Sequence, residues 1–182
     1  MPADARSDDD LMLLARANVP AAFSALVARH QRRALRVAGR QLGPGAITAA
    51  DVVQNTFIDI YRALPRYQPR GRFGSYLFRI LLNQCRIAQR AARIEARHRQ
   101  RTDTALAVAP PHESAVLARE RERDTEAALA RLGAKLRDVV VLRYTGELSY
   151  DEIAATLEIP TGTVKRRLFD AMKKLRTLME PT

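Results

Sequence analysis

The sequence predicts an all-α protein made of two helical domains joined by a flexible linker. Apolar residues recur at steps of three and four along most of the 182 residues, which is the spacing of helices that bury one face. No stretch alternates apolar and polar residues as a half-buried strand would. The periodicity is lost over residues 99–112, which include Pro110-Pro111. We therefore expect a first domain over residues 1–98, a linker over 99–112 and a second domain over 113–182.

Three helices are predicted in the first 65 residues. Asp10 is the expected N-cap of a short helix that stops ahead of Pro20, because proline cannot continue a helix from its interior. A second helix follows and ends at the glycine-rich segment 43–45. Thr48 is the expected N-cap of a third helix, which Pro65 terminates.

The third helix has one apolar and one polar face. Its inward residues are expected to be Val53, Phe57, Ile60, Tyr61 and Leu64. Its outward residues are Asp51, Gln54, Asn55, Ile58 and Arg62. Ile58 is apolar on the polar side, which favours a protein partner there, although single exposed apolar residues are common.

A long fourth helix is predicted from about Ser75, with two different stripes. The inward stripe is Leu77, Ile80, Leu81, Gln84, Ile87, Ala88, Ala91 and Ile94. The second stripe is basic and consists of Arg79, Asn83, Arg86, Arg90, Arg93 and Arg97. A solvated face would normally alternate these cations with acids, but Glu95 is the one acid among eleven arginines from Arg62 to Arg101. We interpret the stripe as a nucleic-acid surface.

Aromatic residues gather in the same part of the chain. We expect Phe57, Tyr61 and Phe78 to be core residues because of their helical spacing. Phe73 and Tyr76 lie in a polar, glycine-containing segment beside Arg72. Rings among cations suit a single-stranded nucleic acid, whose bases stack while its phosphates are neutralised.

The second domain contains a predicted helix-turn-helix. Ser149 and Glu152 form a capping box, and a three-residue turn, 158–160, leads to Thr161 as a second N-cap. The second helix would bury Val164, Leu168, Ala171, Leu175 and Leu178. It would present Thr161, Thr163, Lys165, Arg166, Phe169, Asp170 and Lys173, in the place of a DNA recognition helix. The alternative is a plain helical hairpin with a charged face.

The net charge and the cysteine and histidine content limit the classes of function that the chain can have. The net charge is +11, which favours nucleic acid or, less strongly, an anionic membrane surface as the partner. The single cysteine, Cys85, and the lack of an apolar run of membrane-spanning length predict a cytoplasmic protein that is not inserted in a membrane. We expect no cofactor and no metal, since the acidic run 8–10 is explained by the helix dipole. The three histidines are scattered, which argues against an enzyme.

Several of these motifs together resemble the sigma-70 family of bacterial RNA polymerase sigma factors, in particular the extracytoplasmic-function (ECF) type. The run 51–57 (DVVQNTF) with Tyr61 and Arg62 is similar to the family's region 2.2. Residues 73–80 (FGSYLFRI) with Asn83 are similar to regions 2.3 and 2.4. Residues 141–144, 148–154 and 162–168 are similar to region 4. The resemblance covers nearly the whole chain apart from the linker.

The resemblance implies a role for each group of residues. Core RNA polymerase, through its β′ and β subunits, and promoter DNA would be the partners, and an anti-sigma factor is a further candidate. Polymerase binding would fall to Asp51, Gln54, Asn55, Ile58 and Arg62. The melted minus-10 element would be held by Arg72, Phe73, Tyr76, Arg79, Asn83, Arg86 and Arg90. The minus-35 duplex would be read by Thr161, Thr163, Lys165, Arg166, Arg167, Phe169 and Lys173.

Two other functions are weighed against this one. A stand-alone helix-turn-helix regulator would use the second domain and leave the basic, aromatic part of the first domain unexplained. An enzyme acting on nucleic acid would need a set of catalytic side chains that the spacing of residues does not supply.

Overall fold

The computed structural model describes residues 6–43, 48–101 and 125–179, and these residues form helices and the turns between them, with no strand among them. The first unit contains α1 (Asp8–Arg16), α2 (Pro20–Leu42), α3 (Ala49–Ala63), the 3₁₀ turn η2 (Leu64–Arg66) and α4 (Phe73–Arg101). The second contains a helical segment over residues 125–131, α6 (Ala134–Val140), the π-helical turn η3 (Val141–Thr145), α7 (Tyr150–Leu157) and α8 (Thr161–Met179). The all-α prediction is confirmed.

Helix ends follow local capping signals. Thr48 Oγ1 accepts from the Asp51 backbone N–H at 3.2 Å, as predicted. The cap of α1 was assigned wrongly: Ser7, not Asp10, is the N-cap, and Asp10 is the third residue of a capping box with it. The prediction of Thr161 as the N-cap of the last helix was wrong: Thr161 is the first residue of α8, and the Pro160 carbonyl oxygen accepts from the Val164 N–H at 3.2 Å. The Thr161 hydroxyl donates instead to Asp151 Oδ1 at 3.0 Å.

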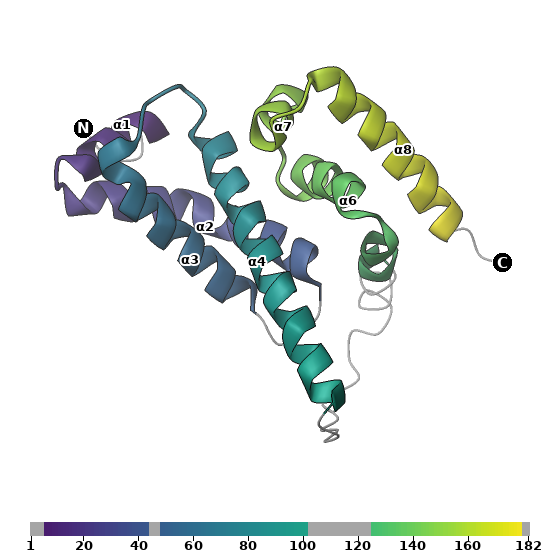
Figure 1. Cartoon of the computed structure of the whole chain (residues 1–182). Helices are drawn as coiled ribbons and strands as arrows, with labels where there is room; N and C mark the ends of the chain where they lie inside the picture. Colours follow the sequence, from purple (N-terminus) through teal and green to yellow (C-terminus); the bar gives the residue numbers. More distant parts are fainter. Residues whose placement is uncertain (1–5, 44–47, 102–124, 180–182) are drawn as a thin grey trace, which may run out of the picture.

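The two units share one apolar core. Fully buried side chains of the first unit include Leu26, Ile60 and Phe78, and those of the second include Leu142 and Ile153. All of them belong to one continuous cluster, because α7 packs on α4 and η3 packs on α2. Figure 1 shows the α6–α8 group beside the N-terminal half of α4. Each large side chain buried in this way stabilises the fold by about 1.5–3 kcal/mol.

Polar contacts join the same two units. Arg33 of α2 donates from Nε to the carbonyl oxygen of Gly146, and its guanidinium lies 5.0 Å from the centre of the Phe78 ring. Gly146 is tightly enclosed, since a Cβ there would lie 2.7 Å from the Leu142 carbonyl oxygen and 3.0 Å from Leu148 Cδ1. Asp138, 7% exposed, accepts from Gln41 Nε2 at 3.1 Å and from Arg86 Nη2 at 2.7 Å.

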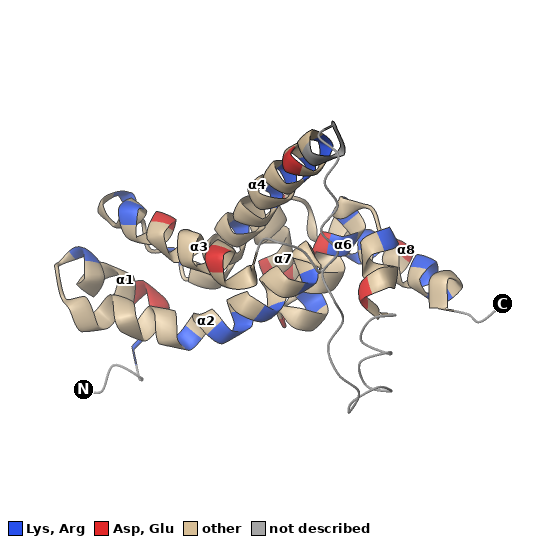
Figure 2. Ribbon diagram, turned by 90° about the horizontal axis from the view of Figure 1, so that it is seen from below, with Lys and Arg blue, Asp and Glu red and all other residues tan. Residues whose placement is uncertain are grey.

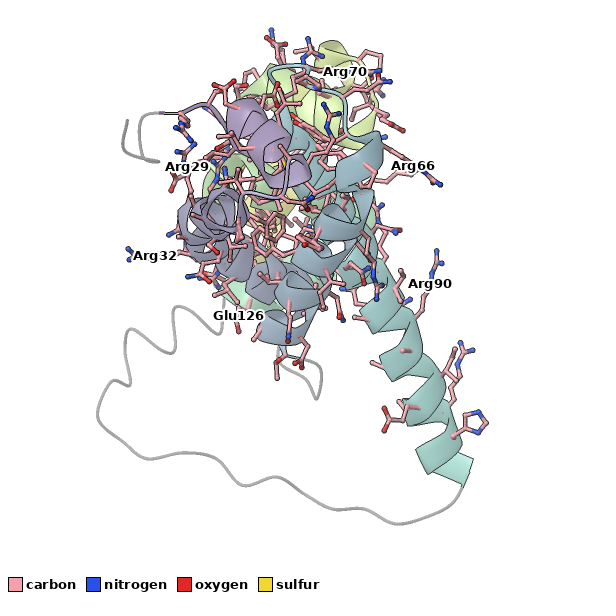
Figure 3. The ribbon with its side chains drawn as sticks, turned by 90° about the vertical axis from the view of Figure 1, so that its left-hand side faces the viewer. Arg29, Arg32, Arg66, Arg70, Arg90 and Glu126 are labelled. Atoms are coloured by element: carbon pink, nitrogen blue, oxygen red, sulfur yellow. The ribbon has the colours of Figure 1, made fainter. Side chains whose placement is uncertain are left out.

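The inward stripe predicted for α4 holds for only half of that helix. Leu77 and Leu81 are fully buried, but Ile87 is 49% and Ile94 56% exposed, and Ala91 is exposed as well. Figure 3 shows the reason: the C-terminal half of α4 projects beyond the other helices. The helix also continues to Arg101, three residues into the predicted linker. Residues 102–124, with the rest of that linker and the predicted start of the second domain, lie outside the described residues.

Cys85 lies in the buried part of α4. Burial raises the pKa of its thiol to about 12, so the group is a neutral core side chain near neutral pH.

Candidate nucleic-acid interface

A pocket of about 530 Å³ opens at the N-terminal end of α4. Residues from η2, the loop after it and the first turns of α4 form most of its wall, and the last residue of α3, α7 and the C-cap of α7 supply the remainder. The lining residues are Ala63, Arg66, Tyr67, Gln68, Arg70, Arg72, Ser75, Tyr76, Arg79, Ala155 and Glu158. Four arginines against one carboxylate make this an anion-binding surface by charge.

Two tyrosine rings form the apolar part of the pocket. The centres of the Tyr67 and Tyr76 rings are 5.5 Å apart, and the Arg79 guanidinium lies 5.8 Å from the centre of the Tyr76 ring. Burial raises the pKa of both phenols, so both stay protonated and uncharged at neutral pH. A flat ring flanked by cations is the arrangement on which an unpaired base stacks.

Phe73 does not take part in the way the sequence predicted. Its side chain is 2% exposed, and its ring packs 5.2 Å from the His30 ring and 6.4 Å from the Tyr67 ring, centre to centre. Phe73 is the first residue of α4, and its ring faces His30 of α2. Because it is enclosed, it is a core residue that supports the two tyrosines and offers no face to a base.

The basic stripe of α4 is accessible along its length. Arg79, Asn83, Arg86 and Arg90 are all exposed, as is Arg72 ahead of the helix. Figure 2 shows basic residues repeating along α4, and Figure 3 places Arg66 and Arg70 near the N-terminal end of α4 and Arg90 on its projecting half.

Two of these arginines pair with acids of the second unit. Arg79 Nη1 lies 2.6 Å from Glu158 Oε1, and Arg86 Nη2 lies 2.7 Å from Asp138 Oδ2. Both arginine side chains keep about half of their surface exposed, 49% and 48%. In this arrangement the second unit therefore supplies carboxylates where a nucleic acid would supply phosphates.

The exposed face of α8 carries most of the residues predicted to meet duplex DNA. Lys165 and Arg166 are exposed, and Phe169 is 71% exposed. Thr161, Thr163 and Arg167 are partly buried, and Lys173 is exposed further along. Val164, Leu168 and Ala171 are buried on the opposite face, as predicted. The Lys165 Nζ lies 5.9 Å and the Arg143 guanidinium 5.0 Å from the centre of the Tyr150 ring, so Tyr150 links α7 to the basic face.

The polar face predicted for the third helix is exposed on α3. Asp51, Gln54, Asn55 and Arg62 are exposed, and Ile58 is 38% exposed. A mainly apolar groove of about 470 Å³ lies beside them between α2 and α3. Its walls include Phe23, Leu35 and Tyr61. Tyr61 was expected in the core, but it is 57% exposed, and its ring makes an edge contact with the Phe23 ring, 5.1 Å between centres.

Sequence reasoning left several pocket residues out of the site. Arg66, Tyr67 and Arg70 line the pocket, although they belong to the arginine-rich stretch that the sequence marks clearly. The arginine-rich composition indicates these residues, but helical periodicity does not predict the turn that brings residues 66–72 to the start of α4.

The acidic run at the start of α1 is used in contacts with its own chain. Asp8 pairs with Arg29 and His30, Asp9 binds Tyr67 and Gly71, and Asp10 completes the capping box. Among the described residues no group of three or more His, Cys, Asp or Glu side chains is arranged to hold a metal ion. The part of the chain that the structure describes also contains no helix suited to crossing a lipid bilayer.

A helix-turn-helix unit packed against a basic helical unit, whose pocket is lined by arginines and tyrosines, is an arrangement typical of DNA-binding proteins. Residues 26–95 match the family model "Sigma-70 region 2", and residues 128–177 match "Sigma-70, region 4". The chain therefore belongs to the sigma-70 family, as an extracytoplasmic-function sigma factor: a non-catalytic subunit that directs transcription initiation by RNA polymerase.

Individual relatives agree with this assignment over most of the chain. The ECF RNA polymerase sigma-E factor of Escherichia coli K12 is 31% identical over 170 residues, which is 88% of this chain and 87% of that protein. The RNA polymerase sigma factor CarQ of Myxococcus xanthus is 35% identical over 159 residues, 87% of this chain and 89% of CarQ. A stand-alone regulator would not account for the match to region 2.

Solved structures show the same fold. CnrH, in complex with the cytosolic domain of CnrY, superposes with a TM-score of 0.73 at 30% identity, covering 96% of this chain and 97% of CnrH. The sigma factor RpoE of Bartonella quintana, in complex with the anti-sigma factor NepR, superposes with a TM-score of 0.62 at 24% identity, covering 85% of this chain and 96% of RpoE.

Proposed function

We propose that the pocket at the start of α4 holds bases of the melted non-template strand at the minus-10 element. The observation that carries this proposal is the grouping of four arginines around the rings of Tyr67 and Tyr76. The arginines would neutralise phosphates, and the exposed face of Tyr76 would stack on an extruded base. Asn83, Arg86 and Arg90 continue the surface along α4 toward the adjoining DNA.

The exposed face of α8 is proposed to read the minus-35 element as duplex. Lys165 and Arg166 have free access to a major groove, where Arg and Lys bind guanine O6 and N7. Phe169 would contact thymine methyl groups, and Thr163, Arg167 and Lys173 would bind phosphates or flanking bases. Thr161, whose hydroxyl is bound to Asp151, would act mainly by fixing the start of the helix.

The exposed face of α3 is proposed to dock on the β′ subunit of the polymerase, with a second contact to β through the region 4 unit. Support comes from the apolar groove beside Ile58, which combines exposed apolar surface with a polar rim of Gln54 and Arg62. Such a patch is typical of a protein interface. Because its proposed partners are promoter DNA and core polymerase, the chain is proposed to act in the cytoplasm.

An anti-sigma partner is also proposed, because the relative CnrH was solved with the cytosolic domain of CnrY. The division of the chain into two domains, with bounds at residues 98 and 113 and a linker between them, is also proposed.

The strand-binding role is tested with holoenzyme assembled from core polymerase and the full chain. Run-off transcription on a genomic fragment library first identifies a promoter, and permanganate reactivity of unpaired thymines then reports opening. Tyr76→Ala and Arg79→Ala are expected to reduce opening about tenfold, since one stacked base contributes about 1–3 kcal/mol. Arg32→Ala, an exposed arginine on α2 away from the pocket, is the matched control. Normal opening by both pocket variants would overturn the assignment.

A further inference from the structure

The loop that forms the front of the pocket is tied to α1. Residues 67–72 connect η2 to α4 and carry Tyr67, Arg70 and Arg72 of the pocket wall. The Arg16 Nη1 of α1 donates to the Tyr67 carbonyl oxygen at 3.3 Å. Asp9, at the other end of α1, makes two shorter contacts to the same loop.

The Asp9 carboxylate bridges the two ends of this loop. Its Oδ1 accepts from the Tyr67 hydroxyl at 2.5 Å, and its Oδ2 accepts from the Gly71 backbone N–H at 2.6 Å. Gly71 has φ +64°, a left-handed conformation that glycine adopts without strain. One side chain therefore fixes both the ring that faces Tyr76 and the turn that leads into Arg72.

This bridge matters because the loop has no regular structure of its own. Ordering a residue costs about 1–2 kcal/mol of conformational entropy. If the loop became ordered only on binding, this cost would lower its affinity for the strand. A loop held in advance by a partly buried carboxylate avoids most of that cost. It also keeps the pocket walls at a fixed spacing, on which discrimination between bases depends.

We infer that Asp9 is a positioning residue for base recognition at the minus-10 element, acting through Tyr67 and Gly71. The inference rests on the strand-binding role proposed above. Asp9 itself touches no DNA. It sets the position of the Tyr67 ring and of the 70–72 backbone, and these set the shape of the pocket.

Three variants separate the positioning role from simple stability. Asp9→Ala removes both acceptors. Asp9→Asn keeps the bridge, because Oδ1 can accept from the Gly71 N–H while Nδ2 donates to the Tyr67 hydroxyl oxygen. Asp10→Ala is the matched control, since Asp10 belongs to the same acidic run and binds Ser7 rather than the loop.

The experiment measures binding of holoenzyme to fluorescent single-stranded oligonucleotides. They carry the non-template minus-10 sequence of a promoter found by run-off transcription, and a set with each base replaced in turn. Asp9→Ala is expected to weaken binding of the matched strand about fivefold to tenfold and to reduce the ratio between matched and mismatched strands. Asp9→Asn and Asp10→Ala are expected to keep wild-type affinity and wild-type ratios.

Two outcomes would overturn the inference: an unchanged matched-to-mismatched ratio for Asp9→Ala, or the same loss of ratio for Asp10→Ala. If Asp9→Ala does not assemble with core polymerase, Tyr67→Phe decides, since it removes one arm of the bridge and keeps the ring. A wild-type ratio in Tyr67→Phe then counts against the inference, and a reduced ratio supports it.

The same oligonucleotides distinguish the inference from the proposed function. If Tyr76→Ala and Arg79→Ala lose affinity while Asp9→Ala behaves as wild type, the pocket holds the strand and Asp9 does not position it. If all three bind as wild type, the strand-binding assignment itself is wrong, and the role of Asp9 is wrong with it.

Discussion

Asp8 illustrates at the scale of a residue how the acidic start of α1 stabilises the first unit. Its carboxylate lies 2.6 Å from Arg29 Nη1 and 2.8 Å from His30 Nε2. Burial alone would raise the pKa of Asp8, but the hydrogen bonds and charges of His30 and Arg29 together outweigh burial, and the pKa of Asp8 is below its usual value.

The lowered pKa predicts a pH-dependent contribution to stability. Because the folded-state pKa of Asp8 is below that of the unfolded chain, its contribution is complete above the unfolded pKa of about 3.9 and is lost as pH falls through the folded value. Urea unfolding should therefore show a larger difference between wild type and Asp8→Asn at pH 6 than at pH 3. A difference that does not change between these pH values would contradict the assignment, and Asp10→Asn serves as the control.

Residues also mark where prediction from the sequence succeeds and where it stops. Phe73 and Tyr76 stand three apart in the same polar segment, and the sequence gives them the same role. The structure separates them, since Phe73 is enclosed by His30 and Tyr67 while Tyr76 lines the pocket. His30 and Phe73 are 43 positions apart in the chain, and helical periodicity carries no information about such a distant contact.

At the scale of elements, local signals predicted some helix ends correctly and others wrongly. The Ser149–Glu152 capping box and the three-residue turn before α8 are both present in the structure, because each depends on side chains within four positions of one another. The start of α1 was misassigned because Ser7 and Asp10 are both good capping residues, and each accepts from the other's backbone N–H; only the structure shows that the helix begins directly after Ser7.

The projecting half of α4 leads to a prediction about its apolar residues. Ile94→Gln should change the free energy of unfolding by no more than about 0.5 kcal/mol, since the side chain is already 56% exposed. Leu81→Ala, at a fully buried position of the same helix, should cost about 2–5 kcal/mol. Urea denaturation of both variants checks the comparison. A large loss for Ile94→Gln would mean that this stripe is covered after all.

The two basic elements should differ in how their arginines affect specificity. Arg166→Ala on α8 should change the preferred base at the minus-35 element, with a loss of discrimination of about 1–3 kcal/mol. Arg93→Ala on the projecting half of α4 should weaken binding evenly across sequences, as expected for a phosphate contact. Holoenzyme binding to a set of minus-35 variants measures both effects. An even loss across all variants for Arg166→Ala would remove its role in base recognition.

At the scale of the whole molecule, the second unit packs against the basic stripe of α4, which is the surface proposed to bind the melted strand. Arg79 cannot bind Glu158 and a phosphate with the same groups at once, and Arg86 is shared in the same way with Asp138. The sequence could not predict this arrangement, since each of these contacts joins residues more than 50 positions apart.

The Arg79–Glu158 and Arg86–Asp138 pairs predict that the second unit competes with DNA for these arginines. Glu158→Gln should raise the affinity of the free chain for a single-stranded minus-10 oligonucleotide about twofold to fivefold, because an exposed ion pair contributes about 0.2–1 kcal/mol. The gain should shrink as salt is added. Fluorescence anisotropy measures it, with Asp170→Asn as a control for the change in net charge. Equal gains in the two variants would point to overall charge and count against competition.

Where the two units meet, one side of the contact is main chain. The carbonyl of Gly146 receives the Arg33 guanidinium, and the space around that glycine admits no side chain, with the Leu142 carbonyl oxygen 2.7 Å from where a Cβ would stand. Only one side of this junction therefore tolerates substitution. A substitution meant to weaken this junction can be made at Arg33, whereas any side chain at position 146 would clash with the Leu142 carbonyl oxygen.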